Sequence, residues 1–274
     1  MTTYNEIIKI ATYIKTYVEK NHKFPTTVKI GSNSYNYGQC AYLLSNSIIN
    51  LGKNSLCQVC RDHPRFRSFF ADRVETGLGF SCEQATRIIL SFKDKIQPIF
   101  ISDDNGKEHL DFIEQSVLAF REKAIEIIQD RNFCINDRIN NLLKECKADF
   151  CDKDFNKVIK TFKRFEKLDK SFSKRLKKTT FSTSTDESLS LYAEQFLVNG
   201  LYRHLSGAED TTWVRARAIA CVLSWWVVKS LYEQQKEGGF STICDIVRAF
   251  SSEVEYSQKN LDKLFALSNK FIKI

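Results

Sequence analysis

The chain has 274 residues, of which 43% are hydrophobic and 27% charged, so it can form one large domain or two small ones with a real core. It contains only 10 Gly and 3 Pro, and this scarcity of turn-forming residues favours helices over a sheet-rich fold. Neither GxGxxG nor GxxxxGK[ST] occurs, which excludes the common glycine-rich nucleotide-binding motifs.

Apolar runs and cysteines bear on localisation. The longest apolar run, Ala218 to Val228, is shorter than the ~18 residues that a membrane-spanning helix needs. The N-terminus has neither a basic region nor a small-residue cleavage site, so no signal peptide is predicted. Nine cysteines without an export signal indicate a reducing compartment, where clustered cysteines are more often metal ligands than disulfides. We therefore expect a cytoplasmic protein that does not enter a membrane.

Residues 4–51 have the pattern of a small module. Helical spacing from Ile7 to Val18 is followed by an alternating stretch, 27–30, which predicts a short strand closed by a turn at 31–33. A further helix is expected over 41–51. We place the domain boundary between residues 52 and 53, which gives domains of 1–52 and 53–274.

Beyond residue 100 the apolar spacing is helical almost throughout. Helices are predicted over 107–132, 135–147, 153–178, 187–206, 211–234, 240–255 and 257–272. The Ser/Thr-rich stretch 179–186 is expected to be a hinge, with Asp186 capping the next helix. The predicted fold class is all-α, mostly a helical bundle, with a small cysteine-rich metal or iron–sulfur site and a small N-terminal α/β-like module.

The net charge of +8 is concentrated in one segment. Residues 153–178 hold eleven Lys and Arg against three acids, an excess equal to the net charge of the whole chain. Apolar residues recur there at steps of three and four: Phe155, Val158, Ile159, Phe162, Phe165, Leu168, Phe172 and Leu176. The segment is either a core-packed helix with a solvated basic face or a docking face for an acidic partner. Nucleic acid is disfavoured, because no aromatic residues alternate with the charges.

Four cysteines near the start of the larger domain have the spacing of a metal site. Cys57 and Cys60 form a CxxC, 21 residues separate Cys60 from Cys82, and 16 residues separate Cys40 from Cys57. Four such thiolates can bind zinc or an iron–sulfur cluster. The fourth ligand stays open, because Cys40 could instead be an apolar core position and His63 is a weaker substitute. The other cysteines are expected to be structural: Cys134, Cys146, Cys151, Cys221 and Cys244.

Two stretches around these cysteines resemble the flagellin lysine-N-methylase family. The matching residues are Leu56, Cys57, Cys60, Arg61, Pro64 and Arg65, then Ser81, Cys82, Glu83, Ala85, Arg87, Ile89 and Leu90. Further matches are 196–199 with 202–205, and 253–257 with 260–261, so the resemblance spans residues 53–272. It implies a methyltransferase that uses S-adenosylmethionine and a 4Fe–4S cluster, and whose acceptor is a lysine of a flagellin-like or surface protein.

The N-terminal module resembles a different family. Residues 17–21, 24–25, 28–31 and 39–44, with Ile48, are similar to the pseudomurein-binding repeat of methanogen surface proteins. The resemblance implies a cell-wall-binding module, and the simpler interpretation is a helical adaptor that packs on the next domain. This leaves a second function open: a non-catalytic binding protein that uses the methylase scaffold with zinc or with no metal.

Charged residues beside the cysteines are the candidate catalytic and cofactor-binding groups. Glu75 and Glu83 could hold the lysine amine, or could only pair with nearby arginines. Arg61 and Arg65 could bind the donor's carboxylate or offset the charge of a thiolate-ligated cluster.

Two further groups of residues have competing interpretations. Arg203 and His204 with Glu209 and Asp210 form a second polar patch, in which His204 is expected to be a packed helix histidine. The tryptophans are expected in the core rather than in a cage for the sulfonium donor: Trp213, Trp225 and Trp226.

Overall fold

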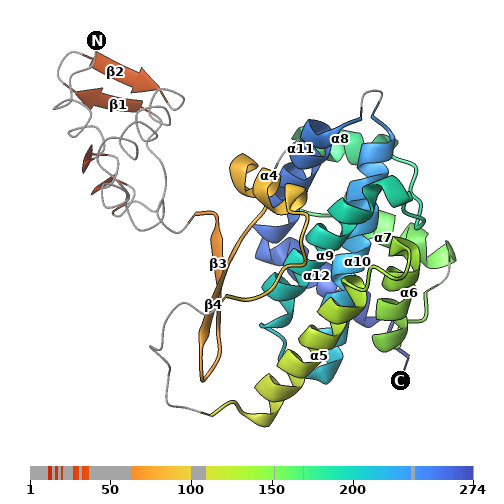
Figure 1. Cartoon of the computed structure of the whole chain (residues 1–274). Coiled ribbons are helices and arrows are strands. Elements are labelled where there is room, and N and C mark those ends of the chain that lie inside the picture. The colour runs from red at the N-terminus through yellow and green to blue at the C-terminus, as the bar shows by residue number, and fades with distance from the viewer. Residues whose placement is uncertain are drawn as a thin grey trace. The chain divides into compact units, whose positions relative to one another are not determined.

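The computed structural model describes residues 12, 13, 16, 17, 20, 27–30, 33–36, 63–99, 109–150, 152–168, 170–235 and 238–273. The chain divides into two compact units, residues 1–63 and 64–274 (Figure 1). The predicted domain boundary between residues 52 and 53 and the predicted helix 41–51 lie outside the described residues.

The first unit contains a two-stranded antiparallel sheet. Strand β1 (Thr27–Ile30) pairs with β2 (Asn33–Asn36), with Thr27 opposite Asn36 and Ile30 opposite Asn33. The strand predicted over 27–30 is therefore confirmed. The backbone is also helical at residues 12, 13, 16, 17 and 20, which agrees with the helix expected there.

The second unit begins with a β-hairpin that sequence patterns did not predict. Strands β3 (Arg65–Phe69) and β4 (Val74–Leu78) pair antiparallel, and Phe70 and Arg73 exchange backbone hydrogen bonds across the turn. Gly77 lies opposite Phe66, and a Cβ at Gly77 would come within 2.3 Å of the Phe66 ring. The absence of a side chain at Gly77 therefore lets this ring lie flat across the hairpin.

The rest of the second unit is helical. This agrees with the prediction beyond residue 100, whereas the helix at Glu83–Ser91 was not predicted. The helices are α4 (Glu83–Ser91), α5 (Phe112–Ile128), α6 (Ile135–Glu145), α7 (Asp152–Lys163), α8 (Lys170–Lys178), α9 (Ser190–Leu205), α10 (Thr211–Glu233), α11 (Phe240–Phe250) and α12 (Gln258–Asn269). A 3₁₀ turn (Glu187–Leu189) precedes α9, and a π-helical turn (Ser251–Glu255) continues α11.

Side chains cap several of these helices. Asp111 and Glu114 form a capping box at the start of α5, and Asp210 accepts two backbone hydrogen bonds at the start of α10. Asp186 accepts from the backbone of Ser188 and caps the 3₁₀ turn, as predicted. The predicted starts at 211, 240 and 257 agree with the structure to within one residue, whereas α5 begins at Phe112 rather than at 107.

Helix α10 forms the centre of the core. Every residue from Ala218 to Leu231 is buried, because α10 packs against α5, α9, α11 and α12 (Figure 1). A helix that is apolar on all sides must be covered on all sides. Trp225 and Trp226 are buried there, and the buried thiols of Cys221 and Cys244 also pack in the core, as predicted.

One buried cation interrupts this apolar helix. The ammonium of Lys229 donates to the Ser182 hydroxyl at 2.8 Å and to the Ser184 carbonyl, and it also contacts Glu233. Trp225 donates to the hydroxyl of Thr185 at 3.0 Å. The Ser/Thr-rich stretch 179–186 is thus fixed to α10 at several points, which argues against the hinge predicted there.

The basic segment differs from its prediction, because 153–178 forms two helices rather than one. The chain leaves the helix after Lys163 and resumes it at Lys170. Asn260 causes the break: its side chain accepts from the backbone N–H of Glu166 at 2.8 Å and donates to the carbonyl of Glu166 at 3.0 Å. Glu253 accepts from the backbone N–H of Leu168 at 3.0 Å.

This break changes one predicted core position. Six of the eight apolar residues of the segment are buried: Phe155, Val158, Phe162, Phe165, Phe172 and Leu176. Ile159 is half-buried. Leu168 is 57% exposed, because it lies in the non-helical connection rather than on the buried face of a continuous helix.

Replacing Asn260 should destabilise the second unit strongly. The Asn260→Ala variant loses three hydrogen bonds of a buried side chain, to both backbone groups of Glu166 and to the carbonyl of Glu253. We expect a loss of about 2–4 kcal/mol in the free energy of unfolding, measured by urea titration. The matched control is Asn140→Ala on the exposed face of α6, which should change stability by less than about 0.5 kcal/mol. Equal effects of the two substitutions would contradict this account of the break.

Candidate functional site

Cys82 is the one predicted metal ligand that lies among the described residues. It is a free, half-buried cysteine at the N-cap of α4, and its side chain does not cap the helix. The turn before it is fixed, because Thr86 donates its hydroxyl proton to the carbonyl of Phe80 at 2.6 Å. The thiol therefore occupies a defined position at a helix N-terminus, where the helix dipole favours negative charge.

Residues 78–81, just before Cys82, are held by three separate segments. Gly79 donates its backbone N–H to the carbonyl of Pro64 at 2.7 Å, which closes the hairpin. The side-chain amide of Asn199 on α9 donates to the carbonyl of Leu78 at 2.9 Å. The hydroxyl of Ser81 donates to that of Tyr256 at 2.8 Å.

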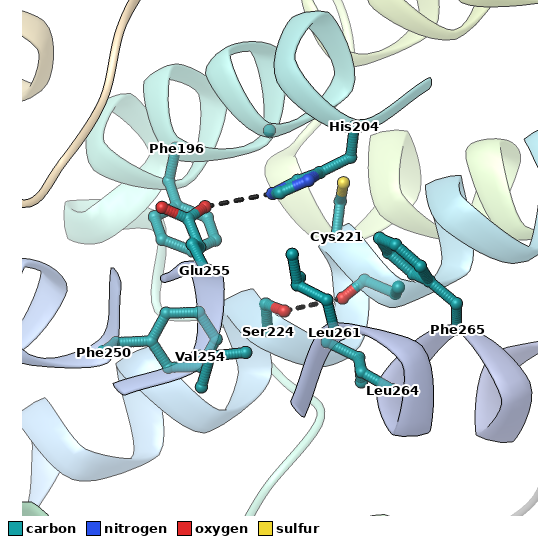
Figure 2. A pocket seen from close by; sticks show the side chains of 12 residues that line it. Phe196, His204, Cys221, Ser224, Phe250, Val254, Glu255, Leu261, Leu264 and Phe265 are labelled. Carbon is teal, nitrogen blue, oxygen red and sulfur yellow. Dashed lines mark hydrogen bonds and ion pairs between the residues drawn. The ribbon is translucent and has the colours of Figure 1, made fainter. Parts of the chain in front are cut away.

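Beneath this turn lies a buried ionic cluster. The side chain of Glu255 is only 5% exposed and accepts from Arg203 at 2.9 Å and from Ser251. His204 lies 3.1 Å from the other carboxylate oxygen (Figure 2). Glu255 ends the π-helical turn, a distortion that occurs often at functional sites.

Arg203 joins the ionic cluster to the Cys82 turn. Its guanidinium carbon lies 5.3 Å from the centre of the Tyr256 ring and 5.8 Å from that of Phe66. A Cβ at Gly79 would come within 2.7 Å of the arginine nitrogen, so the backbone approaches the guanidinium as closely as only glycine permits. The positive charge of Arg203 therefore lies between the turn and the Glu255 carboxylate.

The surroundings fix the charge states of Glu255 and His204. Burial alone would raise the pKa of Glu255, but the charge of Arg203 and the hydrogen bonds from His204 and Ser251 outweigh it and hold the pKa at about 2. Burial lowers the pKa of His204, and Glu255 offsets this only in part. At neutral pH the cluster therefore contains an ionised carboxylate beside a neutral imidazole.

A small cavity adjoins this cluster (Figure 2). It has about 10 Å³ of space for the centre of a water molecule, which is room for about one water. Its lining is mainly apolar, with the side chains of Glu255, His204, Cys221 and Ser224 as the polar groups. Burial raises the pKa of the Cys221 thiol well above its ordinary value, so this thiol stays protonated. The cavity is too small for a nucleoside-sized ligand.

The two predicted catalytic carboxylates are both engaged in ion pairs. Glu75 on β4 binds both terminal nitrogens of Arg121 at 2.7 Å, and its side chain is 21% exposed. Glu83 pairs with Arg87 one helical turn later at 3.2 Å and stays 54% exposed. Arg65 lies on β3 with an exposed side chain. Glu75 and Glu83 therefore lie on different elements, and each has its own arginine partner.

The remaining predicted site residues lie outside the described residues. They are Cys40, Cys57, Cys60 and Arg61. His63, the weaker candidate ligand, is described and is exposed. Within the described part of the chain, no group of three or more His, Cys, Asp or Glu side chains could hold a metal ion. Three of the four proposed ligands fall outside that search.

The second polar patch differs from its prediction. Arg203 and His204 pair with Glu255 rather than with Glu209 or Asp210, and Asp210 instead caps α10. His204 is a packed helix histidine, as predicted.

Sequence analysis missed the arginine that binds Glu75. Arg121 is 3% exposed and lies on the apolar stripe of α5, four residues from both Val117 and Ile125. Arg138 has the same kind of position on α6, where it binds Glu194 at 2.7 Å. A charged residue at a core position of a helical pattern must find a buried partner, and that was the available signal.

Three separated stretches that carry the family resemblance meet at this site. Ser81, beside Cys82, contacts Tyr256, and Arg203 contacts Glu255. The ring of Phe80 stacks on that of Phe196 at 5.3 Å between centroids. Contacts within the described residues therefore join stretches around positions 80, 200 and 255.

Comparisons of the chain with protein-family models, curated proteins and solved structures found no match. Among the helices that the structure describes, none combines the length and the apolar character needed to cross a membrane. The resemblance to the flagellin lysine-N-methylases thus stays a hypothesis based on the quoted residues.

Neutralising Glu255 should destabilise the fold, because Arg203 would keep a buried charge without its partner. For Glu255→Gln we expect a loss of about 3–5 kcal/mol in unfolding free energy at neutral pH. Glu126→Gln, on the exposed side of α5, is the matched control and should have almost no effect. If the Glu255→Gln variant were as stable as the control, the ion pair would contribute nothing to the free energy of unfolding.

Acidification should also destabilise the fold. The pKa of Glu255 lies near 2, below its ordinary 4.5, so its stabilising contribution is complete above pH 4.5 and lost as the pH falls towards 2. The lowered pKa of His204 acts in the same direction, because the unfolded chain takes up that proton first below its ordinary 6.5. Urea unfolding at a series of pH values should show that the free energy of unfolding falls as the pH is lowered. Below pH 4.5 this fall should be less steep in the Glu255→Gln variant than in the parent protein. The same slope in both proteins would contradict the assignment.

Proposed function

We propose that the protein is a lysine N-methyltransferase of the flagellin-methylase type, with an iron–sulfur cluster ligated by Cys57, Cys60 and Cys82. The observation that carries the proposal is the meeting of three resemblance-bearing stretches around the Cys82 turn. The proposed acceptor is a lysine of a flagellin-like or surface protein.

The chemistry of Cys82 suits a cluster ligand. Its thiol is free, it is neither deeply buried nor capping its helix, and a helix N-terminus favours the negative charge of a thiolate-ligated cluster.

Methyl transfer to lysine makes defined demands on the protein. The neutral amine of the acceptor forms a bond to the methyl carbon, the carbon–sulfur bond of the S-adenosylmethionine sulfonium breaks, and the product ammonium loses a proton. The reaction needs a carboxylate that can hold the amine in line. Glu83 fits this task better than Glu75, because it is 54% exposed while both oxygens of Glu75 are bound to Arg121.

The second candidate is a non-catalytic binding protein that holds zinc or no metal. Two observations favour it. Both predicted catalytic carboxylates are paired with arginines, and the cavity beside His204 has room for about one water. In this function the second unit would be a scaffold and the first a pseudomurein-repeat-like binding module.

Metal analysis of the full chain, purified without oxygen, separates the two candidates. We expect a coloured protein that contains iron, loses most of that iron in Cys82→Ser and keeps it in Cys134→Ser. Cys134 is the matched control because it is also a free cysteine at a helix N-cap, and it lies on the surface at α6. A colourless protein with about one zinc per chain would support the binding protein. Metal-free protein would refute the cluster.

Labelled S-adenosylmethionine tests the reaction itself. The anaerobic protein should transfer label to lysines of an acceptor in host-cell lysate, and Glu83→Gln should reduce this at least about tenfold. Glu126→Gln is the control for a surface carboxylate and should keep full activity. Absence of labelled lysine with cluster-loaded protein would remove the enzymatic proposal.

A further inference from the structure

The connection between α7 and α8 presents an unpaired concentration of positive charge. Lys160, Lys163, Arg164 and Lys167 are exposed, and Lys263 of α12 donates to the carbonyl of Arg164 at 3.4 Å. None of these five cations forms an ion pair with any residue that the structure describes. One acidic residue, Glu166, lies between Arg164 and Lys167 in the chain. We use the name basic turn for these five cations and Leu168.

Buried side chains anchor the backbone of the basic turn at two residues, Glu166 and Leu168. Asn260 binds both backbone groups of Glu166, and Glu253 accepts from the N–H of Leu168. Both anchoring side chains are buried, with Asn260 0% and Glu253 2% exposed. A surface whose backbone is already ordered loses little entropy when it binds.

An exposed apolar residue lies within this charged surface. Leu168 directly follows Lys167 in the chain and is 57% exposed, although its backbone N–H is anchored to Glu253. A phosphate group gains no favourable interaction from an apolar side chain. A protein segment with an apolar residue between carboxylates would contact both the leucine and the cations.

Membrane insertion and base stacking fit the basic turn less well. The apolar faces of α7 and α8 are buried in the core through Phe155, Phe162, Phe172 and Leu176, so neither face is free to enter a bilayer. Residues 164–168, the described part of the connection, include one aromatic ring, that of Phe165, and it is 5% exposed. No ring there is available for stacking on a base.

We propose that the basic turn is a docking site for an acidic protein segment that carries an apolar residue between its carboxylates. The five cations attract the carboxylates, and Leu168 covers the apolar side chain. The proposal is independent of any chemistry at Cys82, because the basic turn lies on α7, on α12 and on the connection between α7 and α8.

Fluorescence anisotropy with a defined probe tests the proposal. The probe is a short labelled peptide of alternating Glu and Asp with one central Leu, added to the full chain at low salt. The variant Lys160→Gln/Lys163→Gln/Lys167→Gln should bind about tenfold more weakly, since each exposed charge contributes modestly. The control Lys93→Gln/Lys95→Gln/Lys144→Gln removes as many exposed charges elsewhere in the second unit and should bind as the parent does.

Two further comparisons decide the kind of partner. Leu168→Ser should weaken the leucine-containing peptide several-fold and leave a peptide with Ser in its place unchanged. Equal losses in the two triple variants would show attraction to net charge alone and would overturn the site. Tighter binding of a duplex of equal charge, or of phosphatidylserine vesicles, than of the peptide would overturn the protein partner. Circular dichroism of each variant excludes loss of fold as the cause.

Discussion

The carboxylate of Glu255 is the contact on which the surroundings of Cys82 depend. It orients Arg203, whose guanidinium lies against the rings of Phe66 and Tyr256 and beneath the backbone of Gly79. The hairpin, α9 and the π-helical turn thus share one buried charge. Because a buried charge without a partner is costly, the segments that supply its partners must stay together whenever the protein is folded. The geometry of the Cys82 turn is a consequence of that requirement.

Much of the helical fold could be predicted from sequence, because apolar spacing and capping residues act locally. Asp111, Asp186 and Asp210 each mark a helix start through hydrogen bonds within three residues. The break between α7 and α8 could not be predicted, because its cause lies about ninety residues away, in Asn260. The hairpin was missed because its strands are five residues long and pair by a register set partly by Gly77.

The candidate site was predictable only in part. The stretches around Ser81, Arg203 and Glu255 were selected by resemblance, and the structure brings them into contact. The roles of individual carboxylates were not predictable, since the partner of Glu75 is an arginine on another helix. Pairing across elements depends on packing, which a linear pattern does not contain. The cysteines before residue 63 stay a sequence-based prediction.

The buried ammonium of Lys229 has a consequence for the connector that covers it. Loops on protein surfaces usually tolerate insertions and deletions, because little of their backbone is committed to the core. Here oxygens of Ser182 and Ser184 solvate a cation beneath them, and Thr185 receives the indole of Trp225. Adding or removing a residue would shift these oxygens out of register with the cation. The number of residues between α8 and α9 should therefore vary as little among related proteins as the residue types at core positions usually do.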